Sequence, residues 1–140
     1  VFLFSKQIDI RLLLPASSVG LLSAAVLNLN NMRDLESDKK SNKYTLAGYM
    51  GRKNSKLYHF SLILSAIALM IVFQGIMSFS YLMLFTWVAF APLLIHLKII
   101  YSIKNPKRFD PHLKLVALST FAMSLLFASI LVIEQLQQLL

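Results

Sequence analysis

The chain has 140 residues, of which 57% are hydrophobic and only 14% are charged. Because a soluble domain is usually about one quarter charged, this composition excludes an ordinary soluble fold and favours a membrane protein. The formal net charge of +8 could indicate a nucleic-acid partner, but the basic residues lie between apolar stretches, so we expect no nucleic-acid binding. The sequence has no cysteine, which excludes disulfide bonds and thiolate metal ligands.

Four stretches are long and apolar enough to cross a bilayer as helices, at about residues 12–29, 60–78, 81–97 and 115–133. A spanning helix needs about 20 apolar residues, and a helix satisfies its own backbone hydrogen bonds inside lipid. We therefore predict an all-α integral membrane fold, a single domain over residues 1–140 with four transmembrane helices in the lipid bilayer.

The basic residues orient these spans. Residues 33–58 carry seven lysines and arginines and residues 98–114 carry five, whereas the link near residues 75–80 carries none. By the positive-inside rule, both basic loops are cytoplasmic and the C-terminus is outside. The pattern predicts a multi-pass protein of a cell membrane, such as the bacterial inner membrane. Because Val1 begins an apolar run, we also expect a fragment of a longer protein rather than a signal peptide.

The segment with the most informative chemistry is residues 27–51. Asn31, Asp34 and Asp38 are spaced to share one face of a helix that continues from the first span, with Arg33 beside that face. Two carboxylates one turn apart near a helix C-terminus repel each other and oppose the helix dipole, so a cation should compensate them.

Two sources could supply that positive charge. Lys39 and Lys43 follow within about a turn, and carboxylate and amide oxygens also suit Mg²⁺. With Mg²⁺ bound, the basic residues would fit the excess charge of a diphosphate. Judged from spacing alone, a solvated, charge-rich loop is an equally good interpretation.

The ordered string around these residues resembles the second aspartate-rich motif of the UbiA-like membrane prenyltransferases. It is most similar to the 1,4-dihydroxy-2-naphthoate polyprenyltransferases of menaquinone synthesis, whose pattern is close to NNxRDxxxDxxxGKxTL. The matching residues are Asn30, Asn31, Arg33, Asp34, Asp38, Lys43, Thr45 and Leu46. Asn42 replaces the usual glycine, a mild departure because asparagine tolerates the left-handed conformation.

The resemblance implies a nine-helix bundle of which these four spans would be the last four. It implies a Mg²⁺-dependent enzyme that transfers a polyprenyl group from its diphosphate to dihydroxynaphthoate, forming demethylmenaquinone. Asp34 and Asp38 would be catalytic metal ligands, with Asn31 as a further oxygen ligand. Arg33, Lys39 and Lys43 would contact the diphosphate. The family's first aspartate-rich motif is not found in this sequence, so the N-terminal helices of the same protein would be needed as partners and the fragment alone would be inactive.

Other functions compete with this one. A related enzyme with another aromatic acceptor, such as 4-hydroxybenzoate, homogentisate or haem, would share the motif. A CDP-alcohol phosphotransferase needs a denser DxxDGxxAR string, which Asp34 does not begin. A non-catalytic transporter or scaffold subunit would show no Mg²⁺ dependence. His59 and His96, near the inner ends of their spans, are more typical of packing or interfacial anchoring than of catalysis.

Overall fold

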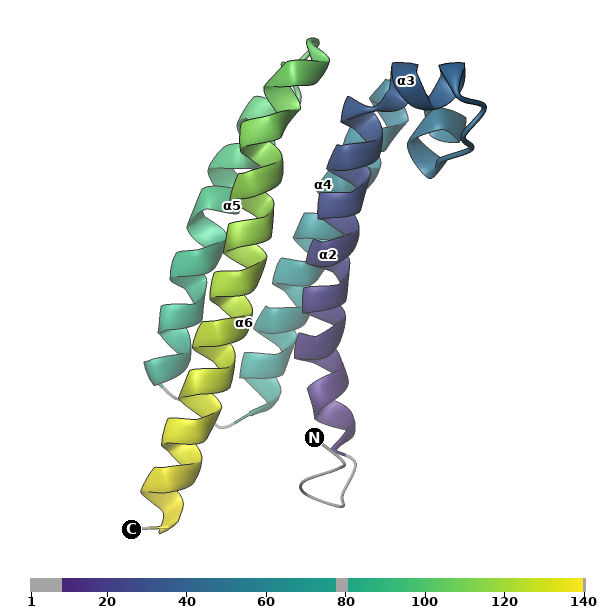
Figure 1. Ribbon diagram of the computed structural model, residues 1–140. Helices are drawn as coiled ribbons and strands as arrows, with labels where there is room; N and C mark the ends of the chain where they lie inside the picture. The colour runs from purple at the N-terminus through teal and green to yellow at the C-terminus, as the bar shows by residue number, and fades with distance from the viewer. Residues whose placement is uncertain (1–8, 78–80, 140) are drawn as a thin grey trace.

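The computed structural model describes residues 9–77 and 81–139, and over those ranges it is helical without strands (Figure 1). The helices are α2 (Leu13–Arg33), α3 (Leu35–Lys40), α4 (Leu46–Ile76), α5 (Thr86–Ile100) and α6 (Asp110–Leu139). Short 3-10 turns precede three of them: η1 (Ile10–Leu12), η2 (Tyr81–Phe85) and η3 (Pro106–Phe109). Four segments are long and apolar enough to cross a membrane, namely Ile10–Arg33, Leu46–Ile76, Tyr81–Ile100 and Pro106–Glu134, which confirms the predicted fold class.

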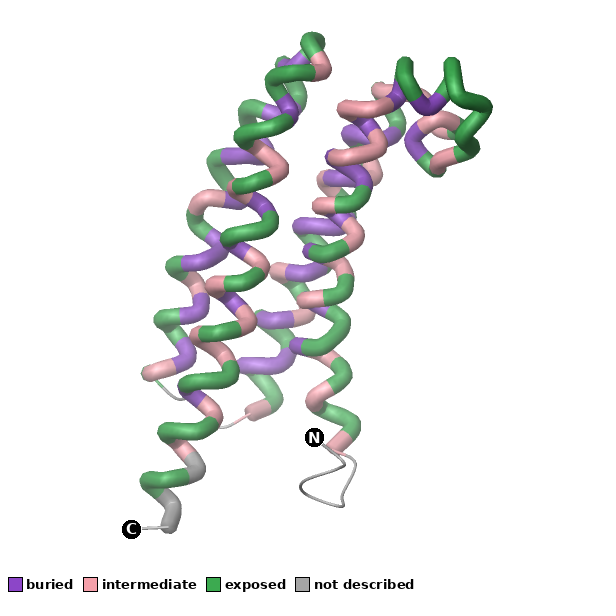
Figure 2. The backbone as a smooth tube through the Cα atoms, in the orientation of Figure 1, coloured by how far each residue is buried: buried purple, intermediate pink, exposed green. Residues whose placement is uncertain are grey.

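The four long helices run side by side, with α2 packed on α4, α5 on α6, and α6 on α2 (Figure 1). Side chains such as Leu29, Ile63, Met70 and Leu93 are fully buried between them. Large apolar residues also cover the outward faces, where Figure 2 shows exposed positions along each helix. An apolar outside around an apolar inside is the surface that lipid requires. The protein is an integral membrane protein.

The segment expected to be a basic loop, residues 33–58, is largely helical, so that expectation is wrong. It contains α3, and α4 begins at Leu46, well before residue 60. The Thr45 hydroxyl caps α4 by accepting a hydrogen bond from the Gly48 amide at 3.1 Å. Gly51 interrupts α4 at φ 74° and ψ 165°, a conformation that strains any residue with a side chain. Residue 78, the expected end of the second span, and the N-terminal apolar run lie outside the described residues.

Polar side chains in α2 connect it to α4. The Ser18 hydroxyl donates to the Ala66 carbonyl at 2.8 Å, and the Asn28 amide donates to the Ser55 carbonyl at 2.8 Å. Each bond satisfies a buried polar group inside the bundle, and small residues allow the two backbones to approach closely. The polar character of the first span therefore serves helix packing.

Three histidines from three helices form a hydrogen-bonded chain. His59 of α4 and His96 of α5 are fully buried, with their Nε2 atoms 2.8 Å apart. The Nδ1 atom of His96 lies 2.9 Å from Nδ1 of His112 on α6. Since His96 uses one ring nitrogen on each neighbour, it joins α4 to α6 through α5. The sequence predicts packing roles for His59 and His96, but it does not predict their contact with each other or with His112.

We expect His96→Leu to destabilise the bundle by about 1–2 kcal/mol, because it leaves one ring nitrogen on each neighbouring histidine without its partner. Replacing all three histidines by leucine should cost less than His96→Leu alone, because no unpaired ring nitrogen remains. Denaturant unfolding in detergent would measure both variants, with the half-exposed Leu94 changed to Ala as a control on the same helix. Equal stability of His96→Leu and the parent would show that the chain of histidines contributes nothing.

Candidate active site at the junction of α2 and α3

The acidic motif, Asp34 and Asp38, lies at the break between α2 and α3. Asp34 sits between the two helices at φ −89° and ψ 6°, outside the α-helical region. The continuous helix expected for Asn31, Asp34 and Asp38 is therefore wrong, and α3 turns away from the axis of α2 (Figure 1). The Asp38 amide still donates to the Asp34 carbonyl at 2.8 Å, so the two aspartates remain one helical turn apart along the backbone.

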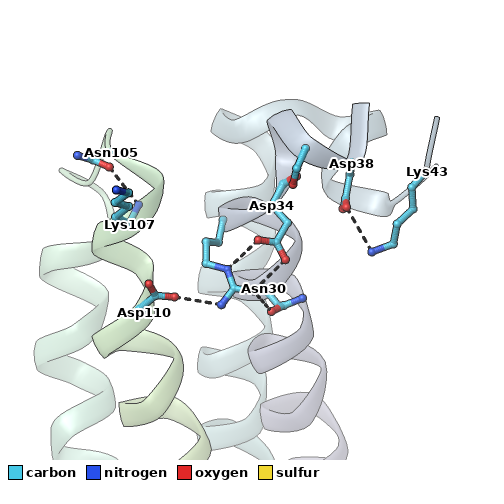
Figure 3. Close-up of polar contacts among 9 residues, drawn as sticks. Asn30, Asp34, Asp38, Lys43, Asn105, Lys107 and Asp110 are labelled. Atoms are coloured by element: carbon cyan, nitrogen blue, oxygen red, sulfur yellow. Dashed lines mark hydrogen bonds and ion pairs between the residues drawn. The ribbon is translucent and has the colours of Figure 1, made fainter. Parts of the chain in front are cut away.

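Arg33 is the centre of the polar contacts at this junction, where Asn30, Asp34 and Asp110 lie near one another (Figure 3). Its Nε and Nη2 atoms donate to Oδ1 and Oδ2 of Asp34 at 2.7 and 2.9 Å. Nη2 also donates to Asn30 Oδ1 at 2.8 Å, and Nη1 reaches Asp110 Oδ1 at 3.0 Å. Because Asp110 is the first residue of α6, Arg33 connects the end of α2 to the start of α6. The sequence showed Asp110 only as an isolated acid with no assigned partner.

The hydrogen bonds from Arg33 lower the pKa of the Asp34 carboxyl below its ordinary value of 3.8. The nearby positive charges of Arg33 and Lys43 act in the same direction. Asp34 is therefore ionised at neutral pH and available as an anionic oxygen ligand.

Asp38 has a different environment. It is only 6% exposed, and its Oδ1 accepts from Lys43 Nζ at 3.3 Å (Figure 3). Its Oδ2 is buried and has no hydrogen-bond partner among the described residues. The Lys43 amide donates to the Asp38 carbonyl at 2.8 Å, closing the turn after α3. Asn42 in that turn has a φ of 54°, the left-handed conformation that asparagine tolerates in place of the motif's usual glycine.

A pocket of about 490 Å³ adjoins the end of α3 and the start of α4. Lys39 and Lys43 line it, together with Tyr44, Thr45 and Tyr49. Two of the three basic residues predicted to contact a diphosphate therefore share one cavity, while Arg33 is held by acidic partners. Asn31 lies half-buried in the last turn of α2, before the break, so it and Asp38 belong to different helices.

The oxygen donors fit Mg²⁺ as a partial ligand set. A buried carboxylate oxygen without a partner, as at Asp38, is costly unless a cation or a donor meets it. Mg²⁺ is usually held by one or two carboxylates while waters and substrate phosphates complete its shell. The described residues contain no group of three or more acidic, histidine or cysteine side chains placed to hold a metal alone. Asp34 and Asp38 could thus supply part of a magnesium site, to be completed by other ligands.

A comparison with models of protein families identifies the family of this chain. The model of the UbiA prenyltransferase family matches residues 1–124. The chain belongs to the UbiA prenyltransferase family. The junction of α2 and α3 is thus the candidate active site of a UbiA family member.

Two curated relatives agree with this assignment. The 1,4-dihydroxy-2-naphthoate octaprenyltransferase of Haemophilus influenzae is 32% identical over 127 residues, which cover 91% of this chain and 41% of the relative. The 1,4-dihydroxy-2-naphthoate octaprenyltransferase of Escherichia coli is 41% identical over 63 residues, 45% of this chain and 20% of the relative. The chain therefore spans less than half the length of these relatives. No solved structure matches it significantly.

The pair of Arg33 and Asp34 predicts an acid-sensitive contribution to stability. The pKa of Asp34 is lower in the folded chain than its ordinary 3.8, so folding is favoured above that value and the benefit is lost as the pH falls through the folded pKa. We expect the free energy of unfolding, measured from about pH 6 to about pH 3, to fall more steeply for the parent than for Asp34→Asn. Glu36→Gln, an exposed site on α3, is the matched control and should keep the slope of the parent. Parallel curves for the parent and Asp34→Asn would refute this role for the pair.

Proposed function

We propose that this UbiA family chain forms part of a membrane polyprenyltransferase that moves a polyprenyl group from its diphosphate to 1,4-dihydroxy-2-naphthoate. The observation that carries the proposal is the buried, incompletely paired carboxylate of Asp38, one turn after Asp34 and beside a pocket lined by Lys39 and Lys43. The names of the two relatives support the choice of acceptor over 4-hydroxybenzoate, homogentisate or haem.

In this proposal Asp34 and Asp38 hold Mg²⁺, and Asn31 supplies or orients a further oxygen. When bound, Mg²⁺ would neutralise the diphosphate as it leaves the allylic carbon of the donor. The ammonium groups of Lys39 and Lys43 bind phosphate oxygens in the pocket that they line. Waters and diphosphate oxygens would complete the magnesium shell, as is usual where Mg²⁺ is held by one or two carboxylates. Among the described residues, no third acidic, histidine or cysteine side chain is placed to join Asp34 and Asp38.

In the proposed reaction, Arg33 would bind phosphate in addition to pairing with acidic side chains. With no diphosphate bound, its guanidinium forms ion pairs with both Asp34 and Asp110. If Asp34 held a cation, the Nε and Nη2 donors of Arg33 would be available for a phosphate oxygen, which a planar guanidinium binds well. Arg33 would thereby keep each anion neutralised as the substrate arrives.

The membrane supplies the remaining requirements. A polyprenyl chain is apolar and would reach the site from the bilayer, while the diphosphate stays at the membrane surface near Lys39 and Lys43. The basic residues of 33–58 and 98–114 favour a cytoplasmic location for this surface in a bacterial inner membrane. The apolar walls of the bundle would keep water away from the reacting allylic carbon.

Asp34→Asn and Asp38→Asn should each lower prenyl transfer at least about 100-fold in the full-length enzyme, because each removes an anionic ligand from a site that stabilises developing charge. Transfer of a labelled polyprenyl group at increasing Mg²⁺ would measure this effect. Glu36→Gln is the matched control, since this acid lies on the same short helix, is exposed and should leave transfer unchanged. Near-parental activity of both aspartate variants at saturating Mg²⁺ would overturn the site.

Lys43→Gln should lower kcat/KM for the polyprenyl diphosphate by about 10- to 100-fold, the usual effect of losing one charge-assisted hydrogen bond to phosphate. KM for the aromatic acceptor should change little, because the pocket of Lys43 is assigned to the diphosphate. Lys40→Gln removes an exposed lysine of α3 that does not line this pocket, and it serves as the control. Equal losses in Lys43→Gln and Lys40→Gln would indicate a general charge effect and count against the assignment.

A further inference from the structure

A second pocket lies between the start of α4 and the connection from α5 to α6. Its volume is about 470 Å³, and its walls are formed by Arg52, Lys53, Lys56, Tyr101, Ile103 and Lys104. Four of these six residues are cations and none is an acid, so the cavity concentrates positive charge. It shares no lining residue with the pocket of Lys39 and Lys43, so it is a separate cavity.

Lys56 fixes one positive charge in the wall. The residue is only 8% exposed, and its Nζ donates to the carbonyls of Tyr101 and Ile103 at 2.8 and 2.6 Å. These carbonyls follow the end of α5 at Ile100 and are left without helical partners. Both acceptors are neutral, so the charge of Lys56 is solvated by dipoles but not cancelled by an anion. An ammonium has three donors, and one remains for a ligand.

Arg52 adds a second charge with unused donors. Its Nη1 donates to the Lys104 carbonyl at 3.0 Å, and Nη2 makes a long contact of 3.5 Å with Glu36 at the edge of α3. Its Nε is buried and has no hydrogen-bond partner in the described part of the chain. A buried guanidinium N–H is costly to leave unpaired, which favours an acceptor at this position.

Positive charge near a membrane surface follows from topology alone, so the arrangement of these residues matters more than their number. Lys107 and Arg108, on the same connection, are exposed and lie outside the pocket. In contrast, Lys56 and Arg52 are held by backbone carbonyls against one cavity, and the exposed Lys53 and Lys104 complete its rim. A concave site with fixed cations is suited to an anion with several acceptor oxygens.

We propose that this pocket binds the phosphate group of an anionic ligand, separately from the catalytic diphosphate. The phosphate would accept hydrogen bonds from Arg52 and Lys56 and interact electrostatically with Lys53 and Lys104. This group could belong to an acidic phospholipid at the membrane surface or to a free phosphate or diphosphate. Because Arg52 also contacts Glu36, the bound anion would be linked through one side chain to α3, which carries Asp38.

The test compares two double variants of the full-length protein. Lys53→Gln with Lys104→Gln removes two pocket charges, and Lys107→Gln with Arg108→Gln removes two charges from the neighbouring surface. All four side chains are exposed, and none donates a hydrogen bond within the described residues, so folding should survive. Unfolding temperatures would verify this, and Lys104→Gln alone would be the fallback. The probes are dioctanoyl phosphatidylglycerol, followed by native mass spectrometry, and inorganic pyrophosphate, followed by calorimetry.

We expect saturable binding of at least one probe, weakened about tenfold in the pocket variant and less than twofold in the surface variant. Loss of phosphatidylglycerol binding would identify a lipid headgroup, and loss of pyrophosphate binding would identify a free phosphate. Equal weakening in both variants, or no saturable binding to the parent, would overturn the proposal. Since the readout is binding, its failure would leave the proposed prenyl transfer untouched.

Discussion

The contacts of Arg33 determine how the candidate site is built. One guanidinium binds Asp34 through two nitrogens, reaches Asn30 within α2, and meets Asp110 at the first residue of α6. Without it, Asp34 would be an anion near the C-terminal end of α2, where the helix dipole disfavours negative charge. Arg33 therefore makes the break between α2 and α3 tolerable, and it ties that break to a helix distant in sequence.

This arrangement also explains why α3 can carry Asp38 away from α2. The chain changes direction at Asp34, but the hydrogen bond from the Asp38 amide to the Asp34 carbonyl keeps the two residues one turn apart. Lys43 then closes the following turn through both its amide and its side chain. The acidic motif is thus a bent helical segment stabilised at each end by a basic residue, and residues that follow Asp38, among them Lys39, Lys43 and Thr45, line the adjoining pocket.

The features that follow from local sequence were predictable. Hydropathy indicated four long apolar helices, and the glycine that the motif usually has at the position of Asn42 is consistent with the left-handed backbone found there. The features that depend on distant partners were not. The partner of Arg33 on α6 is 77 residues away in the sequence. The three hydrogen-bonded histidines, His59, His96 and His112, are not spaced periodically, so no sequence pattern brings them together. The early start of α4 was not predicted because Gly51 and the polar residues 52–56 separate its first residues from the long apolar run, although the Thr45 cap is visible in the sequence.

The two aspartates differ in what a cation would change. At Asp34, both carboxylate oxygens already accept hydrogen bonds from Arg33, so a cation must replace an existing neutralising partner. At Asp38, one oxygen has a long contact with the flexible ammonium of Lys43 and the other is buried without a partner, so a cation would gain a ligand there with little to displace. In the proposed site, this unequal pairing favours Asp38 as the first ligand of a cation, and Asp34 would join it only where Arg33 released that carboxylate to bind phosphate. Arg33, which stabilises the site without substrate, would then couple the binding of the cation to the binding of the diphosphate.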